Sequence, residues 1–131
     1  MMKYVLLLLF LLCGCSPIDI DPAIKKVNTF HDLYKKENYS QIYKMTSTNF
    51  QKETPEKNFI NIMTEAKEKD LGALKKSTLK FERGTHSLLS NNEISLIYYS
   101  EYSKRIVQEL FIFEIESGET KLKGYRYDSI N

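Results

Sequence analysis

The first half of the chain carries apolar residues at three- and four-residue spacing, which is typical of amphipathic helices. This spacing predicts a helix over residues 21–36, with Asp21 as its N-cap and Pro22 in its first turn. Its apolar face consists of Ile24, Val27, Phe30, His31 and Tyr34.

Two more helices are expected before the pattern changes. The first is short and opens at Asn38 or Ser40, ending near residue 45. The second opens at Thr54-Pro55, which repeats the signal of a capping residue followed by proline. It ends at Leu71-Gly72, because glycine readily adopts the left-handed conformation that closes helices.

The second half of the chain changes to a period of two, as expected for strands. Four segments either alternate or are rich in β-branched and aromatic residues: 78–83, 94–102, 106–115 and 122–127. Short turn signals such as Asn91-Asn92 separate them. Helices followed by a four-stranded meander predict an α+β domain, with the N-terminal helices packed on one face of a curved antiparallel sheet.

The N-terminus has the pattern of a signal peptide. An apolar run over residues 5–12 follows Lys3 and is too short to span a bilayer, which takes about 20 helical residues. The run ends in Leu12-Cys13-Gly14-Cys15, which resembles a bacterial lipobox. This resemblance implies that residues 1–14 are a lipoprotein signal peptide and that Cys15 is lipid-modified after cleavage. The alternative is an ordinary secretory peptide with incidental cysteines.

Residues 15–21 are expected to be the lipidated cysteine and a short tether, which reaches at most about 20 Å. Because two or three acyl chains attach a protein stably, the domain over residues 22–131 should lie close to the membrane of a bacterial cell envelope. Ser16 after Cys15 resembles a signal for the outer membrane, if the organism has two membranes. With one membrane, the outer face of the plasma membrane is expected.

Composition excludes several classes of function. A formal net charge of +2 over 131 residues is too small for a typical nucleic-acid-binding protein. The two cysteines, Cys13 and Cys15, form neither a disulfide framework nor a zinc motif. His31 and His86 have no partners at the spacing of a catalytic triad or a metal site. We therefore expect no nucleic-acid partner, no metal and no cofactor.

Three features carry a resemblance to the small NTF2-like (cystatin-like superfamily) domains of bacterial lipoproteins. They are the segment FHDLYKKENYSQIY over residues 30–43, the helix that ends in Leu71-Gly72, and the closing strand KLKGYRY over residues 121–127. The resemblance implies a sheet curled into a cone, often with a pocket on its concave face. It implies no single activity, because this fold hosts enzymes, transport factors and binding modules.

Glu109 is a weak candidate for acid–base catalysis. The ketosteroid-isomerase-like branch of the superfamily uses an aspartate base with a tyrosine, but no aspartate lies inside a predicted strand here. Glu109 shares a strand face with Phe111 and Phe113, so burial is expected to raise its pKa and suit it to act as a general base. The alternative is a solvated glutamate, or one paired with Lys or Arg.

Aromatic residues gather on the predicted sheet and form the candidate binding face. Strand 94–102 is apolar on both faces, so helices on one face would leave Ile97 and Tyr99 as an interaction patch or a homodimer interface. The alternative is that loops and the second helix cover this face. The candidate face consists of Tyr98, Tyr99, Tyr102, Phe111, Phe113, Tyr125 and Tyr127.

These patterns favour a membrane-anchored, non-catalytic binding module that acts through its sheet face or a pocket, on a protein partner or a second copy of itself. No catalytic residue is assigned. One alternative is a small pocket enzyme that uses an inward glutamate with a tyrosine. Another is an immunity or inhibitor lipoprotein directed against a toxin of the cell envelope.

Overall fold

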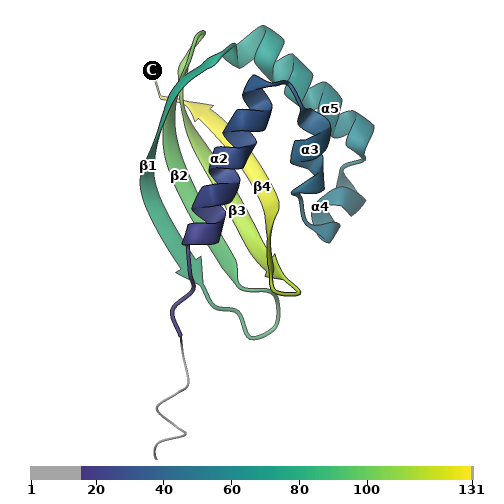
Figure 1. The fold of residues 1–131 in the computed structure, drawn as a ribbon, viewed down its shortest axis with the longest axis vertical. Coiled ribbons are helices and arrows are strands. Elements are labelled where there is room, and N and C mark those ends of the chain that lie inside the picture. The colour runs from purple at the N-terminus through teal and green to yellow at the C-terminus, as the bar shows by residue number, and fades with distance from the viewer. Residues whose placement is uncertain (1–15, 131) are drawn as a thin grey trace, which may run out of the picture.

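The computed structural model describes residues 16–130, so the predicted signal peptide (1–14) and the predicted lipidation site Cys15 lie outside the described residues. Helical elements come first and strands follow, as predicted (Figure 1). The helical elements are α2 (Asp21–Lys35), α3 (Tyr39–Lys44), α4 (Thr48–Glu53), α5 (Glu56–Glu65) and the π-helical turn η1 (Ala66–Leu71). The strands are β1 (Leu74–Thr85), β2 (Glu93–Tyr102), β3 (Ile106–Glu116) and β4 (Glu119–Ser129).

A side chain caps the N-terminus of α3, whereas the N-cap residue of α2 makes no side-chain capping bond. The side chain of Asn38 accepts a hydrogen bond from the backbone N–H of Gln41 and caps α3, which is one of the two starts that the sequence left open. The prediction that Asp21 caps α2 is wrong by one position. The N-cap is Ile20, and the N–H of Asp21 donates to Oδ1 of Asp19 at 3.1 Å.

The segment between the second and third predicted helices contains a helix that the sequence patterns missed. Ser47 caps α4 by accepting a hydrogen bond from the N–H of Phe50. After α5, the helix continues through η1 and ends at Gly72, as predicted. The φ angle of Gly72 is 78°. A side chain at Gly72 would be strained by this φ, and its Cβ would lie 2.0 Å from Oγ of Ser103.

The four strands form one curved antiparallel sheet in the order β1-β2-β3-β4, which confirms the predicted α+β meander. β1 extends well beyond the predicted segment 78–83, because its first residues pair with the end of β2 although their side chains do not alternate in polarity. The register of the β1–β2 pair shifts between Leu74 and Lys76 and again between Leu79 and Phe81. That of the β3–β4 pair shifts between Ile112 and Phe113. Such bulges bend strands locally and help a sheet to curve.

The helices lie on the concave side of the sheet. In Figure 1, α2 crosses this face, and α3, α4 and α5 gather beyond β4. The core between them is strongly aromatic, with Phe30 of α2 packed against Phe111 of β3 at 5.1 Å between ring centroids. The fully or nearly fully buried apolar residues include Val27, Phe30, Tyr34, Ile42, Leu71, Ile94, Leu96, Val107, Phe111, Phe113 and Leu122.

The outer edge of β4 is partly paired by the segment between α3 and α4. The N–H of Ser47 donates to the carbonyl oxygen of Leu122 at 2.8 Å, and the N–H of Leu122 donates to that of Met45 at 2.9 Å. This pairing holds the α3–α4 segment against one end of the sheet.

Within residues 16–130, no helix is long and apolar enough to cross a membrane.

Candidate functional site

Glu109 is completely buried at the centre of a hydrogen-bond cluster beneath α2. Nε2 of His31 lies 2.9 Å from Oε1 of Glu109, and the hydroxyl of Tyr102 donates to Oε2 at 2.8 Å. The hydroxyls of Ser100 and Tyr125 donate to Oε1 and Oε2, respectively. We call these five residues the Glu109 cluster.

The sheet register explains how the Glu109 cluster forms. Glu109 lies opposite Tyr98 of β2 and Tyr127 of β4. Ser100 and Tyr102 follow Tyr98 at a spacing of two, so their side chains point to the same concave face. His31 approaches from the buried face of α2. Four elements thus converge on one carboxylate.

The surroundings of Glu109 change its ionisation in two opposing ways. Burial raises the pKa of the carboxyl. The hydrogen bond and charge of His31, with the hydrogen bonds from Ser100 and Tyr125, lower this pKa by a larger amount. The net result is a pKa below the ordinary value, which is the opposite of the raised pKa expected from the sequence. Burial and the nearby carboxylate raise the pKa of Tyr102 and Tyr125, so both stay protonated as donors.

This geometry does not suit Glu109 to act as a general base. A carboxylate offers about four lone-pair positions, and here four side-chain donors occupy them. Its exposure is 0%, so a substrate would have to displace these donors in order to reach it. A carboxylate with a lowered pKa is also a weaker base. We therefore regard the cluster as structural. Glu109 is neither solvated nor paired with Lys or Arg, and its partner is instead the buried His31.

The seven residues of the candidate binding face do not share one surface. Tyr99 is 42% exposed on the convex side, where Nζ of Lys80 lies 5.5 Å from its ring centroid. Tyr125 and Tyr127 are half-buried on the concave side of β4. The other four residues are buried in the core: Tyr98, Tyr102, Phe111 and Phe113.

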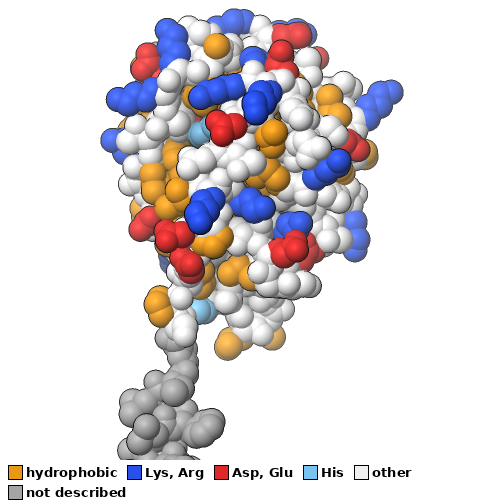
Figure 2. Space-filling model, in the orientation of Figure 1, with side chains coloured by type: hydrophobic (Ala, Val, Ile, Leu, Met, Phe, Trp, Pro, Cys, Tyr) orange, Lys and Arg blue, Asp and Glu red, His pale blue; other side chains and the backbone are white. Residues whose placement is uncertain are grey.

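The convex side of the sheet faces away from the helices and is partly apolar. Phe81 pairs with Ile97, which pairs with Leu110, so that the three side chains form a row across the sheet. Phe81 is 48% exposed. Figure 2 shows the opposite side of the molecule, where α2 covers the sheet and where basic and acidic side chains separate the apolar patches.

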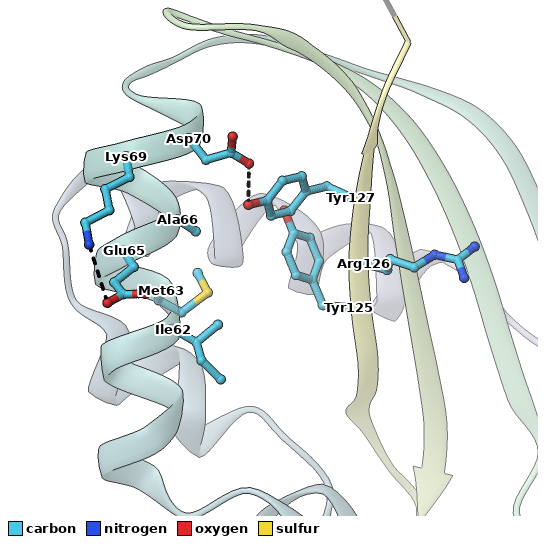
Figure 3. A pocket seen from close by; sticks show the side chains of 9 residues that line it. All are labelled: Ile62, Met63, Glu65, Ala66, Lys69, Asp70, Tyr125, Arg126 and Tyr127. Atoms are coloured by element: carbon cyan, nitrogen blue, oxygen red, sulfur yellow. Dashed lines mark hydrogen bonds and ion pairs between the residues drawn. The ribbon is translucent and has the colours of Figure 1, made fainter.

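A cavity of about 510 Å³ opens between the α5–η1 helix and β4 (Figure 3). Tyr125 and Tyr127 project from β4 toward the helix, whereas Arg126 points away from it. The walls of the cavity are mostly apolar. The lining residues are Ile62, Met63, Glu65, Ala66, Lys69, Asp70, Tyr125, Arg126 and Tyr127.

Polar groups gather at one end of this cavity, around Asp70. The hydroxyl of Tyr127 donates to Oδ2 of Asp70 at 2.8 Å, and Nη2 of Arg105 lies 2.9 Å from Oδ1. Burial and the hydrogen bond to Asp70 raise the pKa of Tyr127 to about 12. The cavity thus combines apolar walls with a tyrosine and a carboxylate that are held in place by direct contacts.

Tyr125 connects the cavity with the Glu109 cluster. Its ring lines the cavity, and its hydroxyl donates to Glu109. The Glu109 cluster therefore holds one wall of the cavity rigid.

The sequence missed the helical side of this site because Asp70 and Ile62 stand out by no motif. Ser100 had a usable signal, since its alternation with Tyr98 and Tyr102 places a hydroxyl on the inner face.

Metal binding has no support in the part of the chain that the structure describes, where no three His, Cys, Asp or Glu side chains come together as ligands could. His86 lies exposed in the β1–β2 connection.

Comparison of the sequence with protein-family models and with curated proteins finds no match.

Proposed function

We propose that this protein is a membrane-tethered lipoprotein of the bacterial cell envelope that binds a small, largely apolar ligand without catalysing a reaction. The cavity between α5–η1 and β4 carries this proposal. Its volume of about 510 Å³ lies within the range of small-molecule sites, which are mostly apolar with a few fixed polar groups. Tyr127 and Asp70 are such groups here, because each is oriented by a partner.

The ligand class follows from the walls. Ile62, Met63 and Tyr125 offer apolar and aromatic contacts, and a flexible methionine adapts to ligands of irregular shape. The polar end holds Asp70, whose charge is already paired with Arg105. A ligand with an apolar body and one neutral hydrogen-bonding group fits this arrangement better than a strongly charged one.

A non-catalytic role is supported by the state of Glu109, which the hydroxyl of the cavity-lining residue Tyr125 contacts. Its four side-chain donors come from the protein, and its side chain has no exposed surface. A small pocket enzyme would need an inward glutamate that reaches a substrate. The geometry at Glu109 favours the binding module over that alternative.

Membership of the NTF2-like superfamily belongs to the same proposal. The order of elements, the curved sheet and a first helix on its concave face agree with what that resemblance implies. The lipobox-like Leu12-Cys13-Gly14-Cys15 supports the lipid anchor at Cys15. Ser16 supports outer-membrane sorting if two membranes are present, and the outer face of the plasma membrane otherwise.

The binding proposal is tested with the uncharged fluorescent probe N-phenyl-1-naphthylamine on the purified full chain. Substitution Ala66→Phe places a ring in the cavity and should weaken probe binding at least tenfold. The matched control is Ala73→Phe, at an exposed position outside the cavity lining, which should leave binding unchanged. Equal binding by both variants and the parent chain would rule out the cavity as the binding site.

The homodimer or protein partner predicted at the sheet face stays a prediction. On the convex side it would involve Phe81, Ile97 and Tyr99. Light scattering on the full chain in detergent, with Tyr99→Lys as the comparison, tests self-association. A monomer in both cases would eliminate the homodimer.

A further inference from the structure

Two adjacent leucines stand fully in solvent at the tip of the β1–β2 connection. Leu88 has a relative exposure of 102% and Leu89 of 100%, the highest values among the large exposed apolar residues described. Single surface leucines are common and need no explanation. Two neighbouring leucines that share no contact with the domain's core are less easily explained by folding, because they contribute nothing to the packed interior.

The loop that carries these leucines is held together by its own polar groups. The N–H of Ser87 donates to Oδ1 of Asn92 at 2.9 Å, and the hydroxyls of Ser87 and Ser90 lie 2.7 Å apart. The N–H of Ser90 donates back to Oγ of Ser87 at 3.2 Å. These bonds satisfy polar groups at the base of the loop and leave the apolar side chains at its outermost point.

The loop carries no formal charge. No Asp, Glu, Lys or Arg occurs from Gly84 to Asn92, although charged residues make up 27% of the whole chain. Insertion of a segment into a lipid interface is opposed mainly by the desolvation of charges and of unpaired polar groups. This loop has none of the former and has already paired several of the latter.

The loop lies at the same end of the molecule as the start of the described chain (Figure 1). A Cβ added to Gly84, just before the loop, would lie 3.0 Å from the side chain of Ile18. The N-terminal segment is therefore packed against the base of the loop. Since three residues span at most about 10 Å, a lipid attached to Cys15 would be held within that distance of Ile18.

We propose that Leu88 and Leu89 insert into the lipid interface of the membrane that carries the anchor, as a second point of attachment. This inference rests on the lipid anchor at Cys15 in the proposed function. An acyl anchor alone leaves a domain free to rotate about its tether, whereas two contacts define its orientation. Because η1 and the end of β4 lie at the opposite end of the sheet from this loop, the polar end of the cavity is then held away from the membrane (Figure 1).

The test uses the absence of tryptophan from the sequence. Substitution Leu89→Trp in the full, lipid-modified chain introduces a single fluorescent reporter at the loop tip. The matched control is Ile130→Trp, which replaces an apolar residue with 45% exposure just after β4, at the opposite end of the sheet. Both variants are reconstituted into phosphatidylcholine–phosphatidylglycerol vesicles, with and without brominated acyl chains, and their fold is checked by circular dichroism.

The expected result is a blue-shifted emission of L89W in vesicles, quenched by brominated lipid and protected from aqueous iodide. The emission of I130W should stay at the wavelength of exposed tryptophan and be quenched by iodide. A chain that floats with the vesicles while L89W behaves like I130W overturns the insertion of the loop and leaves the anchor intact. A chain that does not float with the vesicles overturns both.

Two other partners that could cover the leucines would give different results in this experiment. A second copy of the chain, or a contaminating protein, would shield L89W equally in detergent solution and in vesicles, without quenching by brominated lipid. That result would also overturn the proposal. Replacement of both leucines in L88S/L89S, compared with S87A/S90A as a second loop variant, should increase the rotational mobility of a spin label at residue 130 on vesicles.

Discussion

Nε2 of His31 in α2 lies 2.9 Å from Oε1 of Glu109 in β3, and 78 positions of the chain separate the two residues. This pair fastens the first helix to the concave face of the sheet. Ser100, Tyr102 and Tyr125 donate to the same carboxylate from two further strands. The buried charge therefore depends on four elements being in place at once.

Substitution Glu109→Gln should destabilise the fold by about 3 kcal/mol, because an amide has one acceptor oxygen where the buried carboxylate accepts hydrogen bonds at two. The matched control is Glu114→Gln on the same strand. Glu114 is also buried, but its Oε1 has no hydrogen-bond partner within residues 16–130, so this change should cost about 1 kcal/mol or less. Urea unfolding followed by circular dichroism measures both, and equal losses would contradict a special role for the Glu109 cluster.

Acid should destabilise the parent chain through Glu109. The pKa of this carboxyl is lower in the folded protein than the ordinary value of 4.5, so below that pH the unfolded chain binds more protons. The stabilisation is therefore complete above about pH 4.5 and declines as the pH falls toward the folded pKa. Unfolding free energies measured from pH 7 to pH 3 should fall more steeply in the parent than in E109Q. Parallel curves would show that Glu109 does not carry the effect.

The bond between Tyr127 and Asp70 should hold the polar end of the cavity. Tyr127→Phe removes this hydrogen bond and should reduce the free energy of unfolding by about 1 kcal/mol. Burial and the bond to Asp70 raise the pKa of Tyr127 from 10.0 to about 12, so the folded state favours the protonated phenol. Its contribution is complete below pH 10 and is lost between about pH 10 and 12.

This alkaline loss is measured as the difference in thermal unfolding between the parent and Y127F. The difference should shrink as the pH rises from 10 to 12. A constant difference over this range would mean that the phenol does not titrate with folding. Tyr43→Phe is a suitable control, because its hydroxyl bonds to backbone carbonyls at another site and Tyr43 is not among the cavity-lining residues.

Glycine at position 72 should be required by packing as well as by backbone conformation. Gly72 and Gly118 have nearly equal positive φ values of 78° and 80°. An added Cβ would meet Oγ of Ser103 at 2.0 Å in the first case and nothing within 4 Å in the second. Gly118→Ala should therefore cost about 1 kcal/mol from the left-handed conformation alone, and Gly72→Ala distinctly more. Equal losses in thermal unfolding would mean that Ser103 simply rotates away.

Much of the architecture was predictable because it depends on local spacing. The change from a period of 3.6 to a period of 2 indicated helices before strands, and Gly72 and Asn38 marked true ends of helices. The missed helix α4 is short and has no buried residue, so it lacks the periodicity by which helices are recognised. The first part of β1 was missed for a similar reason, because main-chain pairing with β2 holds it rather than alternating side chains.

The sequence by itself determined the order of elements, the inward face of α2 and the placement of Glu109 among apolar neighbours, because each depends on residues close in the chain. Only the tertiary structure decided what surrounds Glu109. Burial alone predicts a raised pKa, but His31, Ser100 and Tyr125 supply hydrogen bonds from other elements, and these outweigh burial. The cavity beside β4 and the exposed leucine loop next to Ile18 likewise arise from contacts between remote segments, which spacing along the chain does not encode.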